Sequence, residues 1–436
     1  MIVPANRLLA IVAFIFFPCA VLIATAPTLV VVAAAICLAV VILAVADAVF
    51  SRRRLDAVRI ELPSSLRLVK NREAEFDIRI HYAPKRLRIG LIAPPSLHAQ
   101  EEAFTEVPQE SEACKLPWRA QPAERGAFTI DTAMLESSSR LGLWSIRAKK
   151  PVSCEMRVYP NLMSDKAAAA SLLLNRGTVG VHVQPQVGKG REFEKLREYL
   201  HGDTYDDISW RATARRGIPV TKVYQVERTQ EVYAVIDCSR LTGRRINDEP
   251  VLERFLVSAL LLGLAVENEG DHFGIAAFDD RLKTIVRAGA GRAHFGVCRD
   301  AMYPLKPRLV SPDFRELSRY LRTSLRKRAL LVFLTDLDDT VIAEDFLRNI
   351  GVLRRNHLIL AGMMQPPGVE PLFSNENVET SDDIIDRLGG HLRWHKLAET
   401  QRKLRAQGVT LTMSAPDKFA SNMVRQYRSV KARQLL

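Results

Sequence analysis

Two apolar segments in the C-terminal half of the chain end in side chains that could bind a cation. Residues 231–237 end in Asp237, which Ser239 follows two positions later, and residues 330–336 end in Asp336. In sheets of parallel strands, ligands bind beyond the carboxyl ends of the strands, so we expect these side chains to lie close together. Hard oxygen ligands suit Mg²⁺ or Mn²⁺. We therefore predict a weak divalent-cation site at Asp237, Ser239 and Asp336.

This pattern resembles the metal site of the von Willebrand factor A fold. That site has an Asp-x-Ser-x-Ser loop, a distant Thr and a later Asp. The chain matches it at Asp237, Ser239 and Asp336, but Leu241 stands where the second Ser is expected, and residues 289–294 offer no Thr. The resemblance implies a degenerate site. The alternative is that the acids cap the N-termini of helices, where the helix dipole favours them.

A second resemblance gives an alternative function. Residues 331–342, Leu-Val-Phe-Leu-Thr-Asp-Leu-Asp-Asp-Thr-Val-Ile, are similar to the first motif of haloacid dehalogenase-type phosphatases. That similarity implies Asp336 as the nucleophile and Asp338 as the general acid/base of a metal-dependent phosphatase. The motif normally opens its domain, whereas here two predicted strands precede it. The later apolar segment 358–364 does not end in the required Ser or Thr.

Residues 190–216 hold the most specific motif in the chain. The spacing of Phe193, Leu196 and Leu200 predicts a helix with an apolar stripe, and Gly202 is expected to end it. Asp203 then caps a second predicted helix, which contains Ile208, Trp210 and Ala214. The two predicted helices form a connector between the flanking domains.

This motif resembles the signature of the bacterial domain of unknown function 58 family. The matching positions are Gly190, Glu192, Phe193, Leu196, Arg197, Tyr199, Gly202, Asp203, Ile208, Trp210, Ala214 and Arg215. Asp206 departs from the pattern, since the family usually has Arg there. Residues 426–433 also fit the family's closing helix. The resemblance implies a membrane hairpin, a β-rich segment, the signature and a von Willebrand factor A-like domain.

The same resemblance implies a partner and no established catalysis. Members of the family are often encoded beside MoxR-type AAA+ ATPases, and sometimes beside transglutaminase-like membrane proteins. The expected role is therefore a non-enzymatic adaptor or scaffold for such an ATPase and for other membrane proteins, with no catalytic residues. This expectation rests on analogy within the family.

The N-terminal segment predicts a membrane anchor. Residues 8–46 contain no charged side chain and divide at Ala26-Pro27-Thr28 into two apolar runs. Each run is long enough to cross a hydrocarbon core of ~30 Å, so residues 1–54 are predicted to form a two-helix transmembrane hairpin. Arg7 and Arg52-Arg53-Arg54 place both ends in the cytoplasm, at the bacterial inner membrane. The alternative is a signal peptide cleaved near Ala24-Thr25-Ala26, after which the second run would still anchor the chain.

The remaining chain divides into three predicted stretches. Residues 55–160 alternate polar and apolar side chains between Pro and Gly turns, which indicates a small antiparallel β-sandwich. Residues 161–230 form the connector with the signature, including a short helix at 166–174. Residues 231–436 alternate strands with helices, which is typical of a doubly wound, mostly parallel sheet, so the fold class is α/β. That stretch is the predicted von Willebrand factor A-like domain.

The charge of the chain does not indicate a nucleic-acid partner. Lys and Arg number 62 against 49 Asp and Glu, a formal charge of +13. The excess is spread over the three soluble stretches, and no basic stripe with interleaved aromatic residues is evident. The one dense run, Arg52-Arg53-Arg54, lies where a membrane helix would meet anionic lipid. The six cysteines form no CxxC pair, which favours reduced thiols facing the cytoplasm.

Overall fold

The structure is a computed structural model that divides into two compact units, Met1–Asn161 and Leu162–Leu436. It describes the chain except for residues 26–29, 85, 93, 95, 100–103, 108–112, 165–186, 202, 226–228, 373, 375–380 and 434–436. The short helix predicted at 166–174 lies outside the described residues, as does the rest of the predicted connector between 165 and 186. The two units are described separately below.

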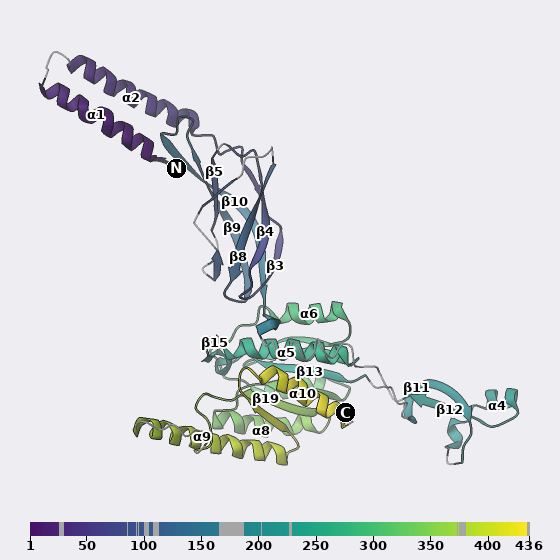
Figure 1. The fold of residues 1–436 in the computed structure, drawn as a ribbon. Coiled ribbons are helices and arrows are strands. Elements are labelled where there is room, and N and C mark those ends of the chain that lie inside the picture. The colour runs from purple at the N-terminus through teal and green to yellow at the C-terminus, as the bar shows by residue number, and fades with distance from the viewer. Residues whose placement is uncertain are drawn as a thin grey trace. The chain divides into compact units, whose positions relative to one another are not determined.

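Two apolar helices begin the first unit. Figure 1 shows α1 (Asn6–Thr25) and α2 (Val30–Ser51) side by side and antiparallel. Among the described residues, α2 alone is long and apolar enough to cross a membrane, with a mean hydropathy of 2.9. The apolar part described for α1, Asn6–Leu22, is about 25 Å long at 1.5 Å per residue, less than a hydrocarbon core of ~30 Å. The second span of the predicted hairpin is therefore not confirmed.

A polar cluster connects the end of α2 to the β domain of the same unit. Asp47 is buried, and its carboxylate accepts hydrogen bonds from Ser139 Oγ at 2.5 Å and from the Leu141 N–H at 3.1 Å. Trp144 Nε1 donates to the carbonyl of Ala44 at 2.8 Å. These contacts explain an acid at the end of an apolar run, because a buried charge is tolerated when hydrogen bonds satisfy it.

The β domain is a sandwich of two sheets, as predicted. One sheet has the order β1-β10-β9-β5-β7, with β3 also paired to β10, and the other has the order β2-β4-β8-β6. Ile78, Ile80 and Ile89 are fully buried between them. The prediction of a purely antiparallel domain is wrong in one respect, because β3 pairs with β10 in parallel. The strands are β1 (Ile2–Pro4), β2 (Arg59–Glu61), β3 (Ser65–Val69), β4 (Ala74–His81), β5 (Leu87–Leu91), β6 (Leu97–Ala99), β7 (Thr105–Glu106), β8 (Ala113–Pro122), β9 (Gly126–Ser138) and β10 (Trp144–Tyr159).

The signature begins in a β-hairpin of the second unit, so its first predicted helix is wrong. β11 (Val187–Glu198) pairs antiparallel with β12 (Val220–Gln225), and Glu198 lies opposite Val220. A 3₁₀ turn (Tyr205–Asp207) and a short helix, α4 (Trp210–Arg216), lie between the strands. The second predicted helix is confirmed at Trp210 and Ala214 only: it begins after Ser209, is not capped by Asp203, and excludes Ile208, which forms a β-bridge with Thr221. Pairing with β12 outweighs the helical spacing, because strand formation depends on distant partners.

A six-stranded sheet forms the core of the second unit. Its order is β17-β16-β13-β18-β19-β20, and each neighbouring pair is parallel except β16 with β17. This is a doubly wound order with an antiparallel edge strand, which agrees with the predicted sheet. The strands are β13 (Glu231–Asp237), β16 (His272–Phe278), β17 (Leu282–Gly289), β18 (Ala329–Leu334), β19 (Leu358–Met364) and β20 (Thr410–Ser414).

Helices cover both faces of this sheet (Figure 1). α5 and α10 pack on the face that carries Val232 and Ala234, whereas α7, α8 and α9 pack on the face that carries Tyr233 and Val235. α5 is almost wholly buried, as expected of a helix against the middle of a sheet. The helices are α5 (Val251–Asn268), α6 (Arg292–Met302), α7 (Phe314–Ser324), α8 (Thr340–Arg354), α9 (Ser381–Ala406) and α10 (Phe419–Ala432). Residues 426–432 of the predicted closing helix lie in α10, which begins earlier, at Phe419.

Candidate functional site

Three neighbouring strands in the second unit are each followed by a buried acid at the same edge of the sheet. β13 ends in Asp237, Asp279 follows β16, and Asp336 follows β18. Their exposed fractions are 0%, 0% and 4%. Because the three strands are parallel neighbours, their carboxyl ends meet at one edge. The sequence reasoning missed Asp279, although residues 272–278 show the same pattern of an apolar strand before an acid.

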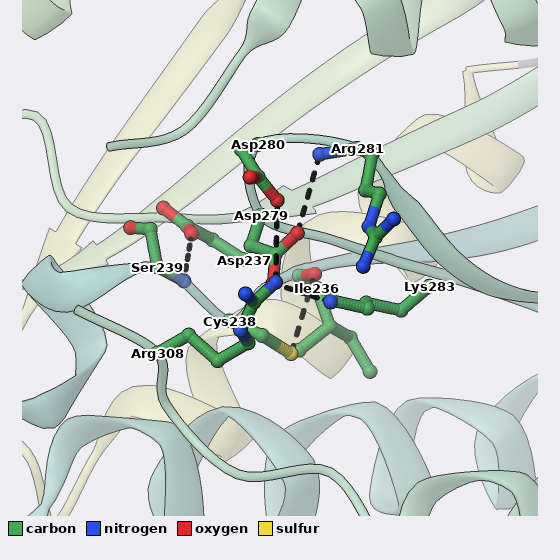
Figure 2. Close-up of polar contacts among 9 residues, drawn as sticks. All are labelled: Ile236, Asp237, Cys238, Ser239, Asp279, Asp280, Arg281, Lys283 and Arg308. Carbon is green, nitrogen blue, oxygen red and sulfur yellow. Dashed lines mark hydrogen bonds and ion pairs between the residues drawn. The ribbon is translucent and has the colours of Figure 1, made fainter. Parts of the chain in front are cut away.

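Asp237 is stabilised by neutral donors. The Ser239 N–H donates to Asp237 Oδ1 at 2.8 Å, and Thr335 Oγ1 donates to Asp237 Oδ2 at 2.7 Å. The hydroxyl of Ser239 is buried beside this carboxylate (Figure 2). Burial raises the pKa of Asp237 to about 6, although these hydrogen bonds oppose the shift. Because Thr335 directly follows β18 and bonds to Asp237, the last residue of β13, it connects the ends of these two strands.

Asp279 is neutralised by two cations. Lys283 Nζ and Arg308 Nη1 each lie 3.0 Å from Asp279 Oδ2, and the Arg281 N–H donates to Oδ1 at 3.2 Å. Figure 2 shows these groups converging on the carboxylate from different segments. Burial alone would raise the pKa of Asp279, but the contacts with Asp280, Lys283, Arg281 and Arg308 outweigh it and lower the pKa. Asp279 is therefore held as a carboxylate.

Asp336 is neutralised by an arginine of the loop after β13. Arg244 Nη2 lies 2.9 Å from Asp336 Oδ2, and Arg244 Nη1 lies 3.5 Å from Asp338 Oδ2. The Asp338 N–H donates to Asp336 Oδ1 at 3.1 Å, and Arg393 of α9 also pairs with the Asp338 carboxylate. Burial raises the pKa of Asp336, and the charge of Arg244 opposes that shift.

The predicted metal ligands lie at one edge of the sheet, and protein groups already contact both of the carboxylates among them. Both carboxylate oxygens of Asp237 are engaged by protein donors, and Oδ2 of Asp336 faces the guanidinium of Arg244. Leu241 supplies no oxygen from its side chain at the position of the expected second hydroxyl. Within the part of the chain that the structure describes, no group of three or more His, Cys, Asp or Glu is placed to hold a metal ion.

The residues of the phosphatase motif also lie together, in an arrangement that suits structure better than nucleophilic attack. Asp336 is 4% exposed and paired with Arg244, so its carboxylate does not present a free oxygen to a substrate. Asp339 is the N-cap of α8, and its Oδ1 accepts the Val341 N–H at 2.9 Å. Asp339 therefore caps α8, whereas the alternative interpretation assigns capping to Asp237 and Asp336.

An ionic pocket of about 500 Å³ opens beside these acids. Three cationic and three carboxylate side chains line it, together with Leu241 and Thr340: Arg240, Arg244, Lys396, Asp336, Asp338 and Asp339. Arg240 Nη2 lies 3.7 Å from Asp339 Oδ2, which is a loose pair. Lys396 is exposed and makes no ion pair with a described residue. The pocket therefore offers both signs of charge to a polar ligand.

Two of the described signature residues form an ion pair at the hairpin, whereas others are exposed. Arg197 Nη2 lies 2.7 Å from Asp203 Oδ1, and the Leu200 N–H donates to Asp203 Oδ2 at 3.0 Å. These bonds lower the pKa of Asp203, the Leu200 N–H more than Arg197. The signature residue Trp210 is 71% exposed, and Tyr205, which lies between signature positions, is 75% exposed. One part of the signature therefore shapes the hairpin, and another part faces outward.

The remaining signature positions add little to this site. Ile208 is buried, and the departing residue Asp206 is exposed, with no ion pair to a described residue. Gly190, Glu192 and Phe193 lie in β11, where only the backbone is described. Gly202 lies outside the described residues.

Comparison with known proteins gives one family match. A family model described as "Protein of unknown function DUF58" matches residues 195–381, which include most of the signature and the three acids. No curated protein matches the chain.

Many solved structures are similar to part of the chain, and three of them are described here. BatB, a conserved hypothetical protein from Bacteroides thetaiotaomicron, is 13% identical and covers 47% of this chain and 99% of its own, with a TM-score of 0.29. An aerotolerance-related membrane protein from Bacteroides fragilis is 12% identical over 46% of this chain and 99% of its own, with a TM-score of 0.30. Proximal thread matrix protein 1 from the mussel byssus, whose MIDAS motif holds zinc, is 14% identical over 47% of this chain and 46% of its own, with a TM-score of 0.27.

Proposed function

Because residues 195–381 belong to the DUF58 family, we propose that this protein is a membrane-associated, non-enzymatic adaptor. The apolar helix α2 anchors it in the bacterial inner membrane, and the sheet of the second unit binds a protein partner at the edge that carries the acids. Arg52-Arg53-Arg54, directly after α2, support a cytoplasmic location for the chain that follows this helix. The partner is a MoxR-type AAA+ ATPase, as the family resemblance implies.

The observation that best supports this proposal is the ionic pocket at the edge of the sheet. Its three cations and three carboxylates are already paired in part, which favours recognition of a polar surface over chemistry on a small substrate. Lys396 has no ion-pair partner among the described residues and remains available for a carboxylate of the partner. Charge pairs of this kind determine which partner binds more than how tightly it binds.

Affinity purification tests the proposal directly. The tagged full-length protein is extracted from bacterial membranes in mild detergent, and proteins that copurify are identified by mass spectrometry. We expect a MoxR-type ATPase with the wild type, and at least tenfold less of it with Lys396→Glu. Arg348→Glu is the matched control, since Arg348 is a 76% exposed cation on α8 outside the pocket. Absence of any AAA+ ATPase from the wild-type sample would contradict the adaptor role.

The alternative function is the phosphatase that uses Asp336 and Asp338. The observation that favours it is their proximity, with the Asp338 N–H donating to Asp336 Oδ1 at 3.1 Å. A screen of the purified protein with phosphate esters in the presence of Mg²⁺ separates the two functions. Hydrolysis that disappears in Asp336→Asn and persists in the exposed variant Asp417→Asn would replace the adaptor proposal with an enzyme.

A further inference from the structure

A pocket of about 880 Å³ opens in the first unit beside the residues that directly follow α2. The segment after this helix contributes Arg52, Leu55 and Asp56 to the lining, and strand β10 contributes residues 146–149. The volume lies within the range of ~300–1,000 Å³ that is usual for sites of small molecules. We call this cavity the α2-end pocket.

Strand pairing leaves the α2-end pocket open along one edge of β10. On the side away from β9, β10 pairs with β1 up to Ile146 and with β3 from Glu155 onward. Beyond Ile146, the Arg147 N–H still donates to the carbonyl of Met1 at 2.8 Å. Lys150 Nζ donates to the carbonyl of Asp56 at 2.8 Å, so the segment after α2 lies beside this edge. The pocket is therefore bounded by β1, that segment and the edge of β10 between its two pairings.

The floor of the α2-end pocket is apolar. Leu55, Leu135 and Ile146 line it and are almost completely buried in the core of the β domain. Phe104 and Met134, which are half-buried, extend the same lining. Eight of the twelve lining residues are apolar, so the pocket can remove hydrocarbon from water.

The exposed lining of the pocket is cationic. Arg52 and Lys149 are exposed and make no ion pair with a described residue. Arg147 Nε lies 3.2 Å from Glu136 Oε2, but the Arg147 side chain is still 49% exposed. Asp56 is the one carboxylate among the described lining residues. Three cations against one acid in the lining favour an anionic ligand.

The pocket lies where lipid headgroups are expected. Residues 8–46 contain no charged side chain, and α2 ends at Ser51, so Arg52 is the first residue after the helix. A bilayer of ~40–45 Å with a hydrocarbon core of ~30 Å leaves a headgroup layer of about 5–8 Å on each side. Residues directly after a membrane-spanning helix occupy this layer, and anionic headgroups attract their cations.

We propose that the α2-end pocket binds one anionic phospholipid. Its phosphate lies beside Arg52 and Lys149, and the upper part of an acyl chain packs on Leu55 and Ile146. The combination of an apolar floor with cations favours a lipid over a free phosphate, which would leave the floor uncovered. This inference rests on the anchoring of α2, which the proposed function includes, and not on any protein partner.

Native mass spectrometry of the full-length protein in detergent tests the proposal. Phosphatidylglycerol, phosphatidylcholine or glycerol 3-phosphate is added in excess to the delipidated protein. We expect one phosphatidylglycerol per chain, at least fivefold less bound phosphatidylcholine, and no bound glycerol 3-phosphate. Equal retention of the two lipids would overturn the selectivity for anionic lipid, and equal retention of glycerol 3-phosphate would overturn the role of the apolar floor.

Two pairs of variants locate the bound lipid. Arg52→Glu should lower the fraction of chains with phosphatidylglycerol at least fivefold, whereas Arg53→Glu, an exposed neighbour that does not line the pocket, should bind as the wild type does. Ala148→Trp, which fills the pocket, should lower it similarly, and Ala127→Trp, at an exposed position of β9 outside the pocket, should not. Equal losses in Arg52→Glu and Arg53→Glu would overturn the pocket as the binding site.

Carbonate extraction of bacterial membranes separates this inference from the anchoring on which it rests. We expect the wild type and Arg52→Glu to remain in the membrane pellet, because α2 and not the bound lipid anchors the chain. A protein that stays in the pellet but retains no phosphatidylglycerol after purification would overturn the lipid site alone. A wild type released by carbonate would contradict the anchor and the lipid site together.

Discussion

Arg244 Nη2 lies 2.9 Å from Asp336 Oδ2, so the chain itself supplies a cation to the acid that follows β18. Asp237, one strand away, instead receives hydrogen bonds from Thr335 and Ser239. The acids at this edge are therefore satisfied by protein groups, each in a different way. Of these two acids, only Asp336 is neutralised by a cation, and the metal site stays a prediction that titration with divalent cations tests.

Removal of the Arg244 guanidinium should destabilise the second unit. Arg244→Met keeps a long side chain but leaves the buried carboxylate of Asp336 without its cation, so we expect the free energy of unfolding to fall by about 2 kcal/mol. Urea denaturation followed by circular dichroism measures this change. Arg348→Met, at a 76% exposed position, should alter stability by less than about 0.5 kcal/mol. Equal effects of the two variants would show that the pair with Asp336 contributes nothing.

Divalent cations should leave the wild-type protein unchanged. Because the oxygens of Asp237 and Asp336 face protein donors, we expect millimolar MgCl₂ or MnCl₂ to shift the melting temperature no more than NaCl of equal ionic strength. Isothermal titration calorimetry should likewise record no binding heat. A heat of binding that is lost in Asp237→Ala would instead establish the metal site predicted from the sequence.

Substitution of Asp237 should change the pH dependence of stability. Burial raises its pKa in the folded state to about 6, well above the ordinary range of an aspartate, so the folded state binds the proton more tightly. The free energy of unfolding therefore falls as the pH rises from about 4 to about 6, by roughly 3 kcal/mol in total. Asp237→Asn, whose amide can still bond to Ser239 and Thr335, should remove this fall and be more stable than the wild type at pH 7.

Denaturation midpoints measured from pH 4 to pH 7.5 test this prediction. Asp417→Asn, at an exposed position in the loop before α10, serves as the control and should keep the wild-type slope. A wild-type protein whose stability rises through this pH window, or an Asp237→Asn variant with the wild-type slope, would be inconsistent with a buried charge at Asp237.

Tyr427 should hold the closing helix α10 to the sheet. Its hydroxyl donates to Asp271 Oδ2 at 2.5 Å, and Lys431 Nζ lies 2.9 Å from the same oxygen. Tyr427→Phe removes one hydrogen bond to a buried carboxylate, which should cost about 1.5–3 kcal/mol in the free energy of unfolding. Tyr320→Phe is the control, since no hydrogen bond joins the Tyr320 hydroxyl to a described residue. If chemical denaturation gives the same free energy of unfolding for Tyr427→Phe and Tyr320→Phe, this role of Tyr427 is contradicted.

Asp47 should hold the loop between β9 and β10 against the end of α2. Asp47→Ala leaves the Ser139 hydroxyl and the Leu141 N–H without their acceptor, so the loop should open more often. Trypsin should then cleave after Arg140 several-fold faster in the detergent-solubilised protein. Asp56→Ala, which changes an exposed acid of the same unit, should leave the cleavage rate unchanged.

The order of side chains along the sequence is enough to predict two kinds of element. These are the elements stabilised by contacts between neighbouring residues and the elements that are completely buried. The apolar helix α2, the strands β13, β16 and β18, and the helix α5 follow directly from hydrophobic runs and their periodicity. The position of acids at strand ends was also predictable, because a doubly wound sheet brings parallel strand ends to one edge.

Tertiary structure alone decided what surrounds those acids. The parallel register of Ile236 with Leu334 brings the ends of β13 and β18 together, and the loop after β13 then carries Arg244 to Asp336. Likewise, β11 is a strand because Glu198 pairs with Val220, although its apolar spacing suits a helix. The periodicity of apolar residues indicates which side chains are buried. Ion pairs and strand pairing, in contrast, depend on contacts between residues far apart in the sequence. For this reason the sequence predicts that acids lie at this edge of the sheet. It does not predict that Arg244 neutralises Asp336.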